Sequence, residues 1–391
     1  MDDSAAGRGS VSISNPISDK LISRVNVQSL PLEIVQDIFE SLLFPYRLLK
    51  VHLAQHRNAS PQLWRTLPYI CRKWHGIALS VLYASIELSR YNAIVKLHKS
   101  LRENPRLRPL IRRLRISVRI NVTVPPTLYT LFLQIIELAE DLQEIASYCL
   151  SVPEGDSVGF PVPFDKHRNL ASLALYGDKS HTLDHTVLRC ISSLRYLRHL
   201  TMANMILAEK VRHSSVPILQ SLESITFEWD HSLEMLDDWL CEHPKLHTLR
   251  MYETSAPSSP PRLLSKKNLI CLEMMHWHWN TPSLSAWFSA CTSLRKLRIT
   301  EDVLLYHPTH IPIHLEELII DFVCYWVDSR VWEAYLNREP NISKIIFISH
   351  REIAWYRTLG DVFLTAAKEH GLKVEYQFPD CDCMGMYGSS Y

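Results

Sequence analysis

The sequence is poor in glycine and has no long apolar run, and these two shortages exclude several classes of protein. Only 10 of its 391 residues are glycine, and they form no glycine-rich loop of the kind that holds nucleotide phosphates. No apolar run reaches the roughly 18 residues that a membrane-spanning helix needs. The patterns GxSxG and HExxH are absent as well. We therefore expect a non-catalytic protein with no cofactor and no membrane segment.

The sequence also lacks an excess of either charge. Its 42 Lys and Arg residues are balanced by 41 Asp and Glu, so we expect no nucleic-acid partner and no membrane surface. The nine cysteines are scattered, and the N-terminus lacks the apolar stretch of a secretory signal. This usage indicates reduced thiols in a cytoplasmic or nuclear protein, or in one found in both compartments.

Two weak constellations could bind a metal. His276 and His278 share one face of an extended segment, and Cys381 and Cys383 flank an aspartate near the C-terminus. A zinc site needs about four ligands, and no further ligands are convincingly spaced. We interpret the first pair as a packed aromatic strand end and the second as part of a frayed tail, and we expect no metal.

What the sequence does contain is apolar residues, at 47% enough for a large core. Residues 1–27 are rich in Ser, Gly and Asp and are expected to form a disordered tail. Ser29 suits a helix cap, and apolar residues then recur at helical spacing through Leu42. A second helical pattern places Trp74, Ile77 and Val81 on one face.

Together the segments LPLEIVQDIFESLL and CRKWHGIALSVLYASIEL resemble an F-box of the layout common in fungal F-box proteins. They carry an opening Leu-Pro, a Glu-Ile, an Ile-Phe, a Cys-Arg-x-Trp and a closing Leu-Tyr. The departure from the family's pattern is an insertion of about residues 46–69 within the box at residues 28–88.

An F-box binds the Skp adaptor, so the resemblance implies that partner and, through it, a cullin–RING ubiquitin ligase whose other subunits carry the chemistry. The adaptor-binding positions that it implies are Leu30, Pro31, Ile34, Ile38, Phe39, Leu42 and Trp74. From the pattern alone, the same residues could instead form the core of a small helical domain.

A second pattern repeats along residues 89–378. An apolar residue is followed three and five positions later by two more, as in Leu170/Leu173/Leu175 and Leu197/Leu200/Met202. Further copies are Ile111/Leu114/Ile116, Leu222/Ile225/Phe227, Leu246/Leu249/Met251, Leu269/Leu272/Met274, Leu294/Leu297/Ile299, Leu315/Leu318/Ile320 and Ile342/Ile345/Phe347. A degraded copy lies at Leu142/Ile145, and Tyr83/Ile86/Leu88 could open the series.

From Leu170 onward the copies start 21 to 27 residues apart, within the range of leucine-rich repeats. The segments between them, such as LEMLDDWLCEHPKL, are helical or extended. Stacked strand–helix units predict an α/β fold, in which the helical F-box leads into a curved solenoid with parallel strands on its concave side and helices on its convex side. Most copies lack the Asn of regular repeats, so the series resembles the degenerate repeats of many F-box proteins. Residues 379–391 are expected to form a C-terminal tail.

Strand alternation nominates a binding surface, because residues that flank the core positions must face the concave side. We expect a protein substrate to bind there, around Arg250, Tyr252, Glu273, Arg298 and Glu317. A second basic segment could bind an acidic or phosphorylated partner, or could be a solvated, salt-bridged surface. Its members are Arg106, Arg108, Arg112, Arg113, Arg115 and Arg119.

These observations together predict the substrate-recognition subunit of a Skp–cullin–F-box ubiquitin ligase. The adaptor would bind to the F-box and the substrate to the repeats. The alternative is a non-degradative repeat scaffold that binds the adaptor without delivering a substrate. An enzyme with an unrecognised site is a third class, which the absence of any nucleophile–base or metal pattern disfavours.

Overall fold

A computed structural model provides the structure of the chain. It describes residues 31, 34–35, 72–116, 126–148, 166–177, 182–183, 185–203, 206–207, 218–228, 233–252, 262–265, 268–275, 281–322, 329–338, 340–349, 365 and 367–377. The N-terminal tail, the insertion at 46–69 and the C-terminal tail expected from the sequence lie outside these residues.

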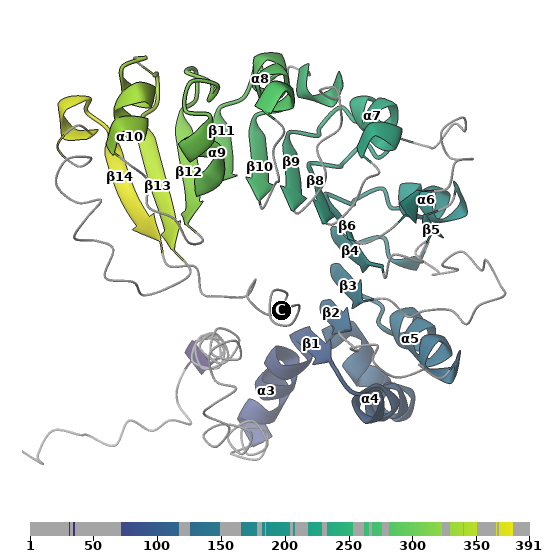
Figure 1. Cartoon of the computed structure of the whole chain (residues 1–391). Coiled ribbons are helices and arrows are strands. Elements are labelled where there is room, and N and C mark those ends of the chain that lie inside the picture. The colour runs from purple at the N-terminus through teal and green to yellow at the C-terminus, as the bar shows by residue number, and fades with distance from the viewer. Residues whose placement is uncertain are drawn as a thin grey trace, which may run out of the picture.

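The repeats form one sheet of twelve strands, all of them parallel, whose spatial order follows the chain (Figure 1). The repeat pattern predicts a parallel sheet of eight or more strands, and the sheet agrees with this prediction. The strands are β1 (Ser85–Leu88), β2 (Arg113–Ile116), β3 (Glu144–Tyr148), β4 (Ser172–Tyr176), β6 (His199–Ala203), β8 (Ser224–Glu228), β9 (Thr248–Tyr252), β10 (Cys271–Met275), β11 (Lys296–Thr300), β12 (Glu317–Phe322), β13 (Lys344–Ser349) and β14 (Lys373–Gln377). A separate parallel pair consists of β5 (Thr182–Leu183) and β7 (Ile206–Leu207).

Helices occupy the outer side of the curve, and the strands line its inner side, as Figure 1 shows for α5 to α8 and α10. The helices are α3 (Arg72–Ala84), α4 (Tyr91–Glu103), α5 (Pro126–Leu138), α6 (His185–Ser192), α7 (Leu233–Cys241), α8 (Thr281–Ala290), α9 (Glu301–Tyr306) and α10 (Ser329–Leu336). In the described part of the chain, 3-10 helices lie at η3 (Pro105–Leu110), between α4 and β2, and at η6 (Arg262–Ser265), between β9 and β10. Among the described residues, no helix combines the length and hydropathy needed to cross a bilayer.

The core lies between the two layers and is filled by alternate strand residues. The expected core positions are each at most 1% exposed: Leu173, Leu200, Ile225, Leu249, Leu272, Leu297 and Leu318. Helix α4 contributes Ile94, Leu97 and Leu101, which are three and four residues apart and so share one face. The predicted parallel sheet with a leucine-rich core is confirmed.

Backbone hydrogen bonds at the entrance to the strands hold the repeats in register. The carbonyl of the residue before one strand accepts two N–H groups from the next repeat, as when Glu223 O accepts from His247 N and Thr248 N at 3.1 Å each. The same pair of bonds occurs at the carbonyl oxygen before each strand of the main sheet from β2, where Arg112 O accepts, to β12, where Glu316 O accepts. Because these groups belong to the main chain, the register does not depend on a ladder of conserved side chains.

Both ends of the sheet extend beyond the clear copies of the repeat. Strand β1 contains Ile86 and Leu88 of the copy Tyr83/Ile86/Leu88 that could open the series, with Leu88 4% exposed. The degraded copy Leu142/Ile145 leads into β3, between the clear copies of β2 and β4, with Ile145 1% exposed. Strand β14 was not predicted, because Gly371 stands where the repeat has its first apolar residue. Gly371 has φ 67, a left-handed conformation that ends the preceding helical turn and that glycine adopts without strain.

Helix α3, which carries the second half of the F-box-like motif, ends at Ala84, and β1 begins at the next residue. Strand β1 then pairs with β2 in the main sheet, with Ile86 opposite Leu114. Ala78 and Val81 of α3 are buried. The motif is thus joined to the first strand of the solenoid without a linker.

Candidate functional site

Residues that face the inner side of the curve line up from strand to strand, because neighbouring strands pair without an offset. We call the third residues of the strands the central row. In spatial order they are Glu87, Arg115, Ala146, Ala174, Thr201, Thr226, Arg250, Glu273, Arg298, Ile319, Ile346 and Glu375. Between Glu87 and Arg115 at one end and Glu375 at the other, the row changes from small to charged to apolar, and the charged part of this middle stretch lies on β9 to β11.

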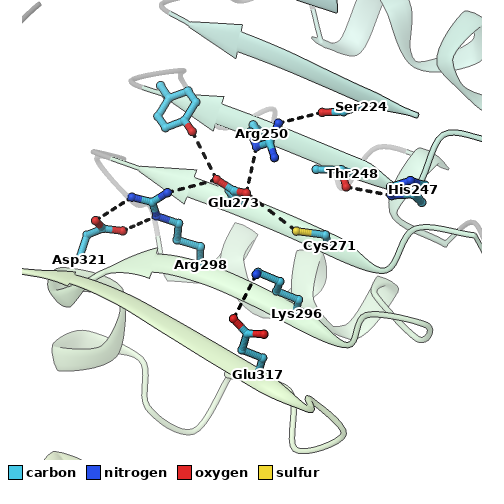
Figure 2. A network of polar contacts seen from close by, with 11 residues as sticks. Ser224, His247, Thr248, Arg250, Cys271, Glu273, Lys296, Arg298, Glu317 and Asp321 are labelled. Carbon is cyan, nitrogen blue, oxygen red and sulfur yellow. Dashed lines mark hydrogen bonds and ion pairs between the residues drawn. The ribbon is translucent and has the colours of Figure 1, made fainter. Parts of the chain in front are cut away.

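At the centre of that charged part, Glu273 joins two neighbouring strands. Arg250 Nε donates to Glu273 Oε1 at 2.9 Å, and Tyr252 Oη donates to Oε2 at 3.3 Å. Arg298 Nη1 approaches Oε2 at 3.5 Å. Figure 2 shows the Arg250 and Arg298 side chains converging on the carboxylate from the strands on either side, β9 and β11. Glu273 is only 6% exposed, and its contacts with Arg250 and Arg298 hold both guanidinium groups in place.

Arg298 is held still more firmly from its other side. Its Nε and Nη2 donate to the two carboxylate oxygens of Asp321 at 2.6 and 2.9 Å, a bidentate arrangement. Asp321 is completely buried. Burial by itself would lower the pKa of Arg298, but its hydrogen bonds to Asp321 and the charges of Asp321 and Glu273 raise that pKa above its usual value. The guanidinium therefore stays charged although most of the Arg298 side chain is buried.

Arg250 is more open than Arg298, with 36% of its side chain exposed against 23%. Its Nη1 donates to Ser224 Oγ on β8 at 3.0 Å. Burial lowers and Glu273 raises the pKa of Arg250, with a net increase. Nη2 of Arg250 has no partner among the described residues, so its two N–H groups can bind another molecule.

Sequence reasoning nominated the right face of the sheet but not the complete network. Arg250, Tyr252, Glu273 and Arg298 meet within hydrogen-bonding distance. Glu317 instead pairs with Lys296 at 3.0 Å, at the entrance to the strands (Figure 2). Ser224 was not nominated, and Asp321, which strand alternation places on the concave face beside Ile320, was not among the five residues expected to bind the substrate. The signal that could have found Asp321 is its spacing of one repeat, 23 residues, from an arginine on the same face.

The cysteine at this site is a protonated thiol that donates a weak hydrogen bond to Glu273. Cys271 lies beside the network, with its sulfur 4.0 Å from Glu273 Oε1. Burial and then the neighbouring Glu273 charge raise the pKa of this thiol to about 11, so it stays protonated at neutral pH. Among the described residues, no group of three or more His, Cys, Asp and Glu could hold a metal ion. His276, His278, Cys381 and Cys383 lie outside them.

The nominated adaptor-binding residues are described only in part. Pro31 and Ile34 are exposed, and Val35, the next residue along the helical turn, is 1% exposed. Ile34 is 45% exposed. The other nominated residues of the first segment, Leu30, Ile38, Phe39 and Leu42, lie outside the described residues. Trp74 belongs to α3, but its side chain is not described.

The basic segment is not a salt-bridged surface throughout. Arg113 approaches Glu144 at 3.6 Å, and Arg108 Nε donates to Leu101 O at 3.0 Å. The side chains of Arg106, Arg112 and Arg115 are exposed and have no partner within the described part of the chain. Arg119 lies outside it. On β2 the burial alternates, so Arg113 and Arg115 face the concave side as expected.

Comparison with known proteins yields structural likeness at low identity. No protein-family model matches the chain, and no curated protein matches it. The solved structures that resemble it include TLR13 in a TLR13-ssRNA13 complex, at 12% identity and TM-score 0.32, covering 72% of this chain and 48% of TLR13. An internalin (inlF) from Listeria monocytogenes has 12% identity and TM-score 0.31, covering 68% of this chain and 67% of the internalin. The chain thus spans about half the length of TLR13. Its repeat architecture is established by the order and register of its own strands.

Proposed function

We propose that the chain is the non-catalytic substrate-recognition subunit of a Skp–cullin–F-box ubiquitin ligase, acting in the cytoplasm, the nucleus or both. Residues 28–88 bind the Skp adaptor, and the concave face of the sheet binds a protein substrate. The observation that carries the adaptor half of this proposal is the exposed Ile34 at a position where the F-box resemblance requires an apolar contact.

Ile34 supports adaptor binding because its exposure is paired with the burial of its neighbour. Val35 N donates to Pro31 O at 3.2 Å, so the segment starts a helical turn in which Val35 faces inward and Ile34 outward. Fully burying an isoleucine side chain contributes about 1.5–3 kcal/mol. An adaptor that covers Ile34 would gain a large part of this contribution without disturbing the fold of the chain.

The arrangement of the two sites also suits a receptor that holds two partners at once. The F-box-like motif is joined to β1, whereas Glu273 lies on β10, seven strand steps along the sheet. At about 4.8 Å for each step, the two are about 34 Å apart along the sheet. The adaptor at one end therefore leaves the charged part of the central row accessible to a substrate.

A pair of matched variants tests adaptor binding. We expect Ile34→Glu to reduce co-purification with a co-expressed Skp adaptor by at least about tenfold, because it places a charge in an apolar interface. Ile313→Glu is the control, because Ile313 is 42% exposed and precedes β12 near the other end of the sheet. The double variant Leu30→Ala/Pro31→Ala should behave like Ile34→Glu. Unchanged adaptor binding by the folded Ile34 and Leu30/Pro31 variants would remove the basis for the proposal.

Substrate capture needs a separate measurement. Reversing the charge at Arg250 and Arg298 together should weaken the capture of proteins that accumulate on proteasome inhibition, and should spare the adaptor. Paired pull-downs of the variant and the native chain score both partners at once. A captured protein whose lifetime does not change when the chain is depleted would favour the non-degradative scaffold.

A further inference from the structure

Two arginines on the central row have donors that the fold leaves unused. Arg115 on β2 is exposed, and its guanidinium has no partner among the described residues, although Glu87 is its neighbour in register. Arg250 on β9 is anchored through Nε and Nη1, and its Nη2 is unpaired within the same residues. By contrast, Arg298 uses Nε, Nη1 and Nη2 on Asp321 and Glu273. Arg115 and Arg250 are therefore the arginines of the row in which a guanidinium nitrogen has no partner among the described residues, and these nitrogens can bind an anion.

The residues between these two arginines have short side chains. Ala146, Ala174, Thr201 and Thr226 follow one another on β3, β4, β6 and β8. Ala174 and Thr201 are half-buried, and the other two are buried. Because no side chain in this part of the row is larger than threonine, a bound segment can lie close to the sheet.

The spacing of the two arginines sets the spacing of the groups they would bind. Arg115 and Arg250 are five strand steps apart. At about 4.8 Å a step this is about 24 Å along the sheet, and an extended chain advances about 3.3 Å per residue, so about seven residues span the distance.

We propose that the central row from Arg115 to Arg250 binds an extended segment of a partner protein that carries two anionic groups, carboxylates or phosphates, about seven residues apart. Guanidinium groups donate paired hydrogen bonds to either kind of anion. Glu273 fixes Arg250 before the partner arrives, so little side-chain freedom is lost on binding. The inference rests on the proposed function only in calling this partner a substrate.

Synthetic peptides test the inference directly on the full chain. The first has two aspartates at positions i and i+7 in a Gly, Ser and Asn background, and the second has phosphoserine at the same positions. The third has the composition of the first with its aspartates adjacent, and the fourth has asparagine in their place. Fluorescence anisotropy of labelled peptides gives each affinity. We expect the spaced anionic peptides to bind more tightly than the other two, and the tighter of the spaced pair identifies carboxylate or phosphate as the preferred anion.

Variants of the chain assign the binding to the row. Arg115→Gln and Arg250→Lys should each weaken binding of the spaced peptides by about three- to tenfold, the range for partly exposed charge-assisted contacts. Lysine at position 250 keeps a cation beside Glu273, so the fold is retained. Arg195→Gln is the control for Arg115→Gln, because Arg195 is exposed outside the strands and both substitutions remove one positive charge, whereas Arg250→Lys leaves the net charge unchanged.

Two outcomes would overturn the inference. The first is equal affinity for the spaced and adjacent aspartates, or for the spaced anionic and neutral peptides. The second is equal weakening by Arg195→Gln and Arg115→Gln, which would indicate attraction to net charge alone. Adaptor co-purification, measured on the same variants, should be unchanged. Loss of peptide binding therefore remains distinguishable from failure of the F-box proposal.

Discussion

The buried pair of Arg298 and Asp321 offers the sharpest test of the concave-face network. Removing one partner of a buried ion pair typically costs about 3–5 kcal/mol. Here 23% of the Arg298 side chain is exposed and asparagine keeps one acceptor, so part of the loss is offset by solvent. We expect Asp321→Asn to lower the free energy of unfolding by about 2–3 kcal/mol, because the Arg298 charge loses its bidentate partner but keeps Glu273.

Urea unfolding followed by tryptophan fluorescence measures this loss as a lower midpoint at an unchanged m-value. Glu317→Gln is the control, because its partner Lys296 is 39% exposed and such pairs contribute at most about 1 kcal/mol. Replacing Arg298 and Asp321 together by leucine should recover most of the lost stability, since no charge is then left unpaired. A midpoint for Asp321→Asn equal to that of Glu317→Gln would refute the burial argument. So would a double variant less stable than Asp321→Asn.

Three further predictions concern groups away from this pair. The hydroxyl of Tyr335 is buried with no partner in the described part of the chain, so Tyr335→Phe should stabilise the protein by about 1 kcal/mol, and a lower melting temperature would contradict this. Burial raises the pKa of Cys271 to about 11 and that of Cys291 to about 12, so both should react with iodoacetamide at pH 8 more slowly than the half-buried Cys190 and Cys241, as read by mass spectrometry. Hydrogen bonds from Lys344 and Lys373 lower the pKa of Glu375 to about 2; the stability that this carboxylate contributes is present above its unfolded pKa and is lost as pH falls from about 4.5 toward 2. The melting-temperature difference between the native chain and Glu375→Gln should therefore shrink between pH 6 and pH 3, and a constant difference would argue against the pairing.

The sheet could be predicted from the sequence because one requirement is repeated in every strand. The strands of the main sheet from β2 to β13 bury the same two positions, so the phase of Leu173, Leu200 and Leu297 carries over to their neighbours. Strand β14 was not predicted, because Gly371 occupies the first apolar position of the repeat. The left-handed backbone conformation there favours glycine, and the hydrophobic pattern carries no information on backbone conformation. The prediction therefore held where burial decided the residue and failed where backbone conformation did.

The candidate site was predictable in its face but not in its pairings. Alternation alone places Arg250 and Glu273 on the concave side, but it does not say which charges meet. Pairing depends on register, and register is set by the main chain at the strand entrances. Glu317 lies opposite Lys296 in the register of β11 and β12, and it therefore pairs with Lys296 rather than with the network. Asp321, further along β12, pairs with Arg298.

The same backbone bonds explain how irregular repeats can support an ordered surface. Arg250 and Glu273 are 23 residues apart, and Glu273 and Arg298 are 25 residues apart. From Leu170 onward the repeats start 21 to 27 residues apart, which is a wider range. These differences are confined to the connections on the outer side, because each new strand is aligned by the preceding carbonyl rather than by the length of the connection. A change in length there moves a helix but leaves the row in place. Substitutions on the row can then alter what the concave face binds without disturbing the leucine core behind it.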